Sequence, residues 1–189
     1  MDPKELFAKA LDEAGGCVMR VEASQMDNPT PCSEWNLREL LNHTIYELLW
    51  LPDLLQGKTI AEVGDKYEGD VLGDDVQAAW KRAADAALAA VKDADLKAVV
   101  HLSYGDKPAE HYIREMATEM LLHGWDIGQG MDCSLMFDPQ AAQAVYDNLL
   151  PNKDTLAGTG LFAPALSVPD DSTVQVKLLA LVGRHTAVA

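Results

Sequence analysis

The stretch LRELLNHTIYELLWLPDLLQ, residues 37–56, decides the fold of this 189-residue chain. Leucines recur along it at the three- and four-residue spacing of a helix face. Ile45 and Trp50 make other faces apolar as well, and a helix that is apolar on several sides is buried among other elements. Asn36, followed three residues later by Glu39, is typical of an N-cap. The sequence therefore predicts a long central helix that begins just after this cap.

Helical periodicity continues on both sides of this segment. Three more long helices are predicted: one from Pro3 with Asp2 as its cap, one over residues 76–93 with Asp74 or Asp75 as its cap, and one over residues 110–127. Gly128 and Gly130 are expected to stop the last of these, because glycine is common just past a helix end.

The remaining segments predict smaller elements. Residues 98–104, AVVHLSY, favour a strand, and Gly105-Asp106 is a plausible turn, so we expect a small hairpin or an extended crossover. Asp138-Pro139 predicts a further helix, and Asp170 or Asp171 a short last one.

Four long helices, each with an apolar stripe, are the ingredients of a bundle. We predict a mainly all-α fold: a four-helix bundle with a small β element and extra C-terminal helices. The chain is expected to be a single domain over residues 1–189, with the bundle in residues 1–150 and a C-terminal extension in residues 151–189.

The composition excludes several classes of partner. The chain has 15 Lys and Arg against 30 Asp and Glu, and this formal net charge of −15 opposes binding to nucleic acid or to anionic membranes. No stretch has the roughly 18 consecutive apolar residues of a membrane span, and the N-terminus lacks the apolar run of a signal peptide. Cys17, Cys32 and Cys133 form no CxxC pair, so neither a zinc knuckle nor a disulfide framework is expected. We expect a cytoplasmic monomer or homodimer that binds neither nucleic acid nor membrane.

The predicted helix of residues 110–127 carries a polar stripe. Glu115, Glu119, His123 and Asp126 follow one another at spacings of four, four and three residues, and therefore lie on one face. Glu119 and His123 form an ExxxH pair that can bind one metal ion from adjacent turns. On spacing alone, a solvated helix face is the commoner explanation of such a stripe.

His43 and Gly124 are the other unusual helical residues. A lone histidine in an apolar helix is more often a packed side chain than a ligand, and a metal role requires His43 to face Glu119 and His123. Gly124 directly follows His123, and glycine inside a helix costs about 1 kcal/mol relative to alanine. It indicates close approach of another element or room for a ligand, unless it is simply tolerated.

Three motifs carry a resemblance to a known family. PTPCSEWNL (residues 29–37) followed by LNH (residues 41–43) resembles the opening motif of the DinB-like metal-binding proteins, and EMLLHGWD (residues 119–126) resembles their second motif. The segment from GLF (residues 160–162) to ALVGR (residues 180–184) is similar to the tail of their compact members. The resemblance covers nearly the whole chain. Among characterised members, the chain resembles the mycothiol-dependent maleylpyruvate isomerases, through their N-terminal domain.

The resemblance implies a DinB-like four-helix bundle that holds one divalent metal ion on His43, Glu119 and His123. Zinc is the first expectation, with iron or nickel as alternatives. Two imidazoles and one carboxylate leave at least one coordination position open for water or substrate. Asp126 matches the last position of the second motif, where a carboxylate can orient an imidazole from behind; a surface salt bridge is the alternative.

Two kinds of chemistry remain open at such a site. The ion can activate a low-molecular-weight thiol, as in mycothiol-dependent transferases and isomerases, or it can activate water for hydrolysis. Glu47 is a candidate base, and Cys32 is expected to pack near Trp35 rather than to take part in catalysis. A non-catalytic metal-binding, small-ligand-binding or stress-response protein is the alternative. Characterised maleylpyruvate isomerases have an additional C-terminal domain that contributes to their site, so isomerisation of maleylpyruvate is not expected here.

Overall fold

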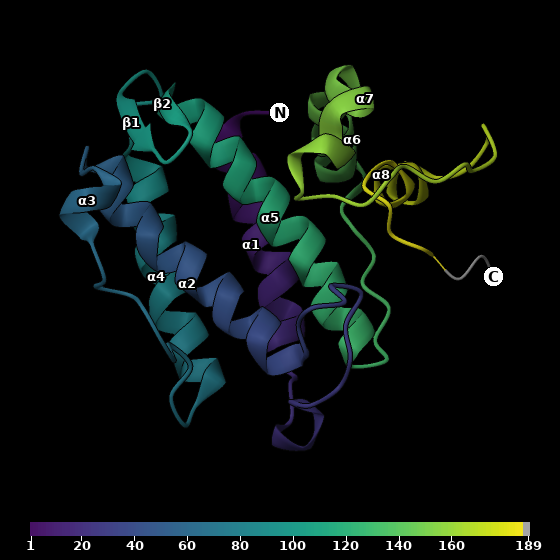
Figure 1. Cartoon of the computed structure of the whole chain (residues 1–189), viewed down its shortest axis with the longest axis horizontal. Coiled ribbons are helices and arrows are strands. Elements are labelled where there is room, and N and C mark those ends of the chain that lie inside the picture. The colour runs from purple at the N-terminus through teal and green to yellow at the C-terminus, as the bar shows by residue number, and fades with distance from the viewer. Residues whose placement is uncertain (187–189) are drawn as a thin grey trace. The chain divides into compact units, whose positions relative to one another are not determined.

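The structure, a computed structural model, describes residues 1–186 and is mainly helical with a small two-stranded sheet, as predicted (Figure 1). The contacts of the described residues divide them into two compact units: residues 2–135, and Met1 together with residues 136–186. The division follows Leu135, whereas the sequence placed the end of the bundle at residue 150. The assignment of residues 1–189 to a single domain stays a prediction.

The long helices of the first unit are α1 (Pro3–Val18), α2 (Leu37–Leu55), α4 (Val76–Asp93) and α5 (Ala109–Gly130). Helix α1 packs along α5, and α2 packs along α4, while contacts between α2 and α5 and between α1 and α4 close the ring. Figure 1 shows α1 and α5 side by side. The apolar stripes of these helices form the core of the bundle. No helix within residues 1–186 is long and apolar enough to cross a membrane.

Helices α1, α2 and α4 begin at their predicted caps, whereas α5 follows Pro108, which makes no side-chain cap bond. Asp2 and Asp75 accept backbone N–H bonds in the first turns of α1 and α4. Asn36 and Glu39 cap α2 reciprocally, since the side chain of each accepts the backbone N–H of the other at 2.9 Å. Local sequence therefore sets where α2, the helix that carries His43, begins.

Helix α5 ends at Gly130, one of the two glycines predicted to stop it, and so runs three residues beyond the predicted Ile127. Gly128 does not stop the helix, and other segments pack closely against both glycines. A Cβ atom on Gly128 would lie 2.9 Å from the Cys133 carbonyl oxygen, and one on Gly130 would lie 3.3 Å from Cδ1 of Leu37. Both glycines therefore allow close packing at this end of the helix.

Shorter elements connect the long helices: η1 (Ala23–Gln25), α3 (Ile60–Val63), and a hairpin of β1 (Val99–Leu102) and β2 (Gly105–Pro108). In the hairpin Leu102 pairs with Gly105, so the turn is formed by residues 103–104 and not by Gly105-Asp106 as predicted. Gly105 has a φ of +115°, which glycine adopts without strain directly after the turn.

The second unit consists of short helices. They are α6 (Pro139–Leu149), η2 (Leu150–Asn152), α7 (Lys153–Leu156), η3 (Ala157–Thr159) and α8 (Val174–Leu181). Helix α6 begins at the predicted Asp138 cap and packs against α8. Helix α8 begins later than predicted, because the side chain of Thr173, and not Asp170 or Asp171, accepts the N–H of its first turn.

Candidate metal centre

Helices α2 and α5 bring the predicted ligands together in the first unit. On α2, Leu40 and Thr44 are fully buried, and His43 lies on a flank that leaves its side chain 27% exposed. His43 Nε2 lies 4.0 Å from Oε2 of Glu119. The rings of His43 and His123 meet edge to face, with centroids 5.3 Å apart. His43 therefore faces the polar stripe of α5.

Glu119 and His123 behave as the ExxxH spacing predicts. His123 Nε2 lies 2.9 Å from Glu119 Oε2, the same oxygen that His43 approaches. One ligand atom from each of the three residues lies within 4.8 Å of the others. Glu115, the first residue of the stripe, is not in this group: it pairs with His111 at 3.1 Å and accepts a hydrogen bond from the Tyr104 hydroxyl.

The other nitrogen of His123 faces a second cluster. His123 Nδ1 lies 3.0 Å from Oδ2 of Asp126, whose side chain is fully buried. The Cys32 thiol donates to the same oxygen at 3.3 Å. Asp126 is thus behind the His123 ring and not on the surface, which is the arrangement that the second motif implied. The position of Cys32 against Asp126 was not foreseen, because the expected neighbour was Trp35.

The loop before α2 holds Cys32 and Trp35 in place. Thr30 donates from Oγ1 to the Trp35 carbonyl oxygen at 2.8 Å and accepts the Cys32 N–H at 3.2 Å. The Asn28 side chain donates to the Gly130 carbonyl at 2.8 Å and ties the loop to the end of α5. As a result the Trp35 ring packs on His43, with centroids 4.5 Å apart. The first motif therefore supplies a candidate ligand, His43, and the loop whose Trp35 packs on it.

The two histidines differ in their proton affinity. Burial lowers the pKa of His43 to about 4, and the neighbouring His123 adds to this effect. Burial also opposes a charge on His123, but its hydrogen bonds with Asp126, Cys32 and Glu119 outweigh that cost and hold the pKa of His123 well above its usual range. Near neutral pH, His43 therefore offers a free nitrogen lone pair.

Glu47, one turn after His43 on α2, has an unusual carboxyl group. Burial raises the pKa of Glu47 to about 7, and the nearby charge of Glu119 adds to the shift. Cation binding at Glu119 would offset this second cause. A carboxyl group that titrates near neutral pH can both accept and return a proton.

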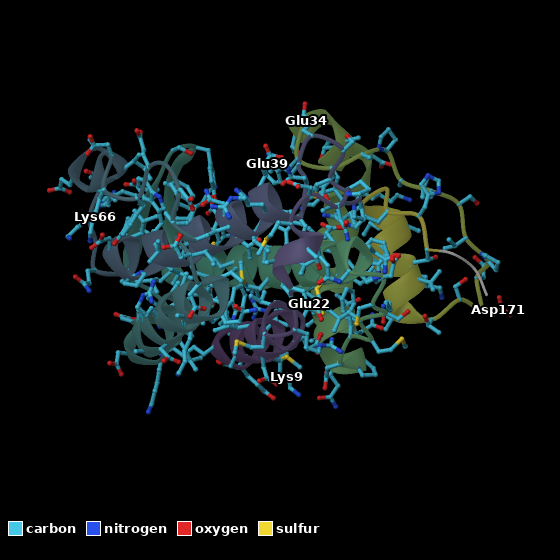
Figure 2. The ribbon with its side chains drawn as sticks, turned by 90° about the horizontal axis from the view of Figure 1, so that it is seen from below. Lys9, Glu22, Glu34, Glu39, Lys66 and Asp171 are labelled. Carbon is cyan, nitrogen blue, oxygen red and sulfur yellow. The ribbon has the colours of Figure 1, made fainter. Side chains whose placement is uncertain are left out.

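An open groove of about 530 Å³ adjoins His43. Its walls include Trp35 and Arg38, and Glu39, labelled in Figure 2, also lines it. Asp70 also lines the groove, and it forms an ion pair of 2.6 Å with Arg38. The groove gives a small molecule a route to His43.

By its fold this protein is a helical bundle, in which the side chains of His43, Glu119 and His123 converge. Residues 7–128 match the family model described as the mycothiol maleylpyruvate isomerase N-terminal domain, and the chain belongs to this family. Two uncharacterised proteins of Mycobacterium tuberculosis, from strains CDC 1551 / Oshkosh and H37Rv, are each 28% identical to it over 143 residues. The matches cover 75% of this chain and 74% of each relative. No solved structure matches significantly.

Proposed function

We propose that this protein binds one divalent metal ion, zinc first, on His43, Glu119 and His123, and uses it in a transferase or isomerase reaction of a small thiol such as mycothiol. The observation that carries the proposal is the convergence of two imidazole nitrogens and one carboxylate oxygen from two helices within 4.8 Å. Membership of a family named for a mycothiol-dependent enzyme supports the choice of a thiol.

The donor set fits a divalent ion. Zinc–ligand bonds of about 2.0–2.2 Å put neighbouring ligand atoms roughly 3.4 Å apart in a tetrahedron. The separations of Glu119 Oε2 from the two Nε2 atoms, 2.9 and 4.0 Å, bracket this value. Asp126 occupies the Nδ1 side of His123, so Nε2 is the nitrogen left to bind.

When bound, such an ion is a Lewis acid that lowers the pKa of a thiol or a water molecule at its open position. The residues of the chain provide the rest. The groove beside His43 receives the substrate, and Trp35, which packs on the His43 ring, lines this groove. Glu47 would accept the proton that a thiol releases and return it to the product, since burial, the main cause of its raised pKa, does not depend on the ion.

The test is the metal content of the purified full-length chain. Wild-type protein incubated with zinc and then dialysed should hold about one ion per chain, and His123→Ala should hold almost none, because one of its three protein ligands is lost. His111→Ala is the matched control: it removes a histidine from the same helix that pairs with Glu115, outside the site, and should retain the metal. Wild-type protein without stoichiometric metal, or a His123→Ala variant that keeps it, would contradict the proposal.

The thiol is tested separately on the zinc-loaded protein. Mycothiol should raise the melting temperature of wild-type protein and leave that of His123→Ala unchanged, because a ligand stabilises only the state that binds it. Turnover of electrophiles should then require both zinc and the thiol. Zinc binding without any thiol-dependent turnover would instead support a non-catalytic metal- or ligand-binding protein.

A further inference from the structure

Asp126 receives hydrogen bonds from two segments of the chain that are far apart in sequence. Its Oδ2 atom lies 3.0 Å from His123 Nδ1, one turn earlier on α5, and 3.3 Å from Cys32 Sγ in the loop before α2. The thiol itself is 3.9 Å from Nδ1 of His123. One carboxylate oxygen therefore joins the loop to the back of a candidate metal ligand.

The geometry suggests what the thiol does. A carboxylate with no exposed surface needs donors, and those donors fix its rotamer. When Asp126 is fixed, it holds a proton on Nδ1 of His123 and directs Nε2 of the ring toward Glu119. A thiol is a weak donor, but it approaches from a loop that Thr30 and Asn28 hold in place.

We propose that Cys32 is a positioning residue of the metal centre: its S–H holds the Asp126 carboxylate against His123 Nδ1 and so sets the orientation in which His123 binds the ion. The inference rests on the proposed metal site. It assigns to Cys32 neither a bond to the ion nor a reaction with substrate.

Direct coordination by Cys32 is the competing arrangement. Cys32, His123 and Asp126 also place one ligand atom each within 4.8 Å of one another. An ion there would have to bind His123 through Nδ1 and displace the Asp126 contact. His43 and Glu119 lie on the Nε2 side, so one ion cannot use all of these groups.

The experiment compares the zinc affinities of Cys32→Ala and Cys32→Ser with wild type, by competition with a chromophoric chelator. We expect Cys32→Ala to bind zinc about tenfold more weakly, at the lower end of the loss seen when an outer hydrogen-bond partner of a metal ligand is removed. Cys32→Ser should stay close to wild type, because a hydroxyl group can donate to Asp126 in place of the thiol. Cys133→Ser should match wild type, because Cys133 is partly exposed and its thiol faces the Ser134 carbonyl oxygen.

Each outcome bears on a different claim. If wild type binds zinc and Cys32→Ala binds it equally tightly, the positioning role is wrong and the metal site stands. If wild type does not bind zinc, the proposed function itself fails. In cobalt-loaded wild type, a sulfur-to-metal charge-transfer band that disappears in Cys32→Ser would show direct coordination and overturn the proposal. Melting curves of the metal-free variants identify any loss of affinity that comes from misfolding.

Discussion

Two buried carboxylates on the bundle helices are satisfied in opposite ways. Asp53, near the end of α2, binds the ammonium groups of Lys58 and Lys66, each at 2.7 Å, and accepts the Tyr67 hydroxyl at 2.8 Å. Asp126 on α5 instead meets an imidazole and a thiol. In Figure 2 the labelled Lys66 lies well apart from Glu39, which lines the groove beside His43.

Under the proposed function, Asp53 is a structural group and Asp126 is a positioning one. The two lysines and the tyrosine all bind the Asp53 carboxylate, and they tie the connection between α2 and α4 to α2. The imidazole beside Asp126 has a second nitrogen, which faces Glu119 and lies near His43, the two other candidate ligands. A buried carboxylate behind an imidazole therefore transmits its position to whatever that imidazole binds.

Exchanging each carboxylate for an amide should separate the two roles. Asp126→Asn should weaken zinc binding by about 10–100-fold, since the carboxylate behind a histidine ligand strengthens and orients it. Asp53→Asn should leave zinc affinity unchanged and lower the melting temperature of the metal-free protein by roughly 3–6 °C. That shift corresponds to about 1.5 kcal/mol of charged hydrogen bonds, the low end of the usual range because both lysines are half exposed.

Chelator competition and melting curves on the same two variants give the complete comparison. A loss of zinc affinity in Asp53→Asn would mean that the two ends of the bundle are coupled. Unchanged affinity in Asp126→Asn would remove the distinction between the two carboxylates.

The effect of Asp53 should depend on pH. Hydrogen bonds from Lys58 and Lys66 hold the pKa of the Asp53 carboxyl well below its usual range. A group whose pKa is lowered by folding stabilises the protein above its unfolded pKa, about 3.9, and loses that contribution as the pH falls. The difference in melting temperature between wild type and Asp53→Asn should therefore be constant from about pH 5 to pH 8 and shrink below about pH 4.

Melting curves across that pH range provide the measurement. A difference that is as large at pH 3 as at pH 7 would show that the amide acts through packing and not through the loss of charge.

The sequence predicted the parts of this structure that depend on local rules. The caps at Asn36 and Asp75 and the four long helices follow from spacing and capping. The hairpin turn was misplaced because Gly105, with a φ of +115°, follows the turn and does not form it. The end of α5 was placed three residues early because Gly128 was taken as a breaker where close packing against the Cys133 carbonyl requires a small residue. Such packing involves residues far apart in the chain, and no local pattern reports it.

In the candidate site, too, local spacing predicted some residues, whereas other contacts depend on tertiary structure. Spacing placed Glu119, His123 and Asp126 on one helix face, but only the motifs joined His43 to them. The contact of Cys32 with Asp126 bridges 94 positions and depends on the path of an irregular loop. A cysteine at a motif position was the only available signal, and it does not identify which side chain the thiol meets.

The smallest expected effects are those of substitutions at two helical glycines, Gly124 and Gly16. A Cβ atom on Gly124 would lie 3.0 Å from both Cα and Cβ of Ala14, so α1 and α5 would have to separate. Gly16 is exposed on α1, and a Cβ atom there would meet nothing within 4 Å. Gly16→Ala should therefore raise the free energy of unfolding by about 0.5–1 kcal/mol, through helix propensity alone.

Gly124→Ala should lower the free energy of unfolding by about 1 kcal/mol, because overpacking of about 1–3 kcal/mol outweighs the same gain in propensity. Urea unfolding of the metal-free variants measures both changes. Opposite signs would show that the residue after His123 is glycine because α1 approaches there. Equal stabilisation by both substitutions would mean that α1 moves away from α5 at little cost in free energy. The glycine at position 124 would then need another explanation, such as room for a ligand beside His123.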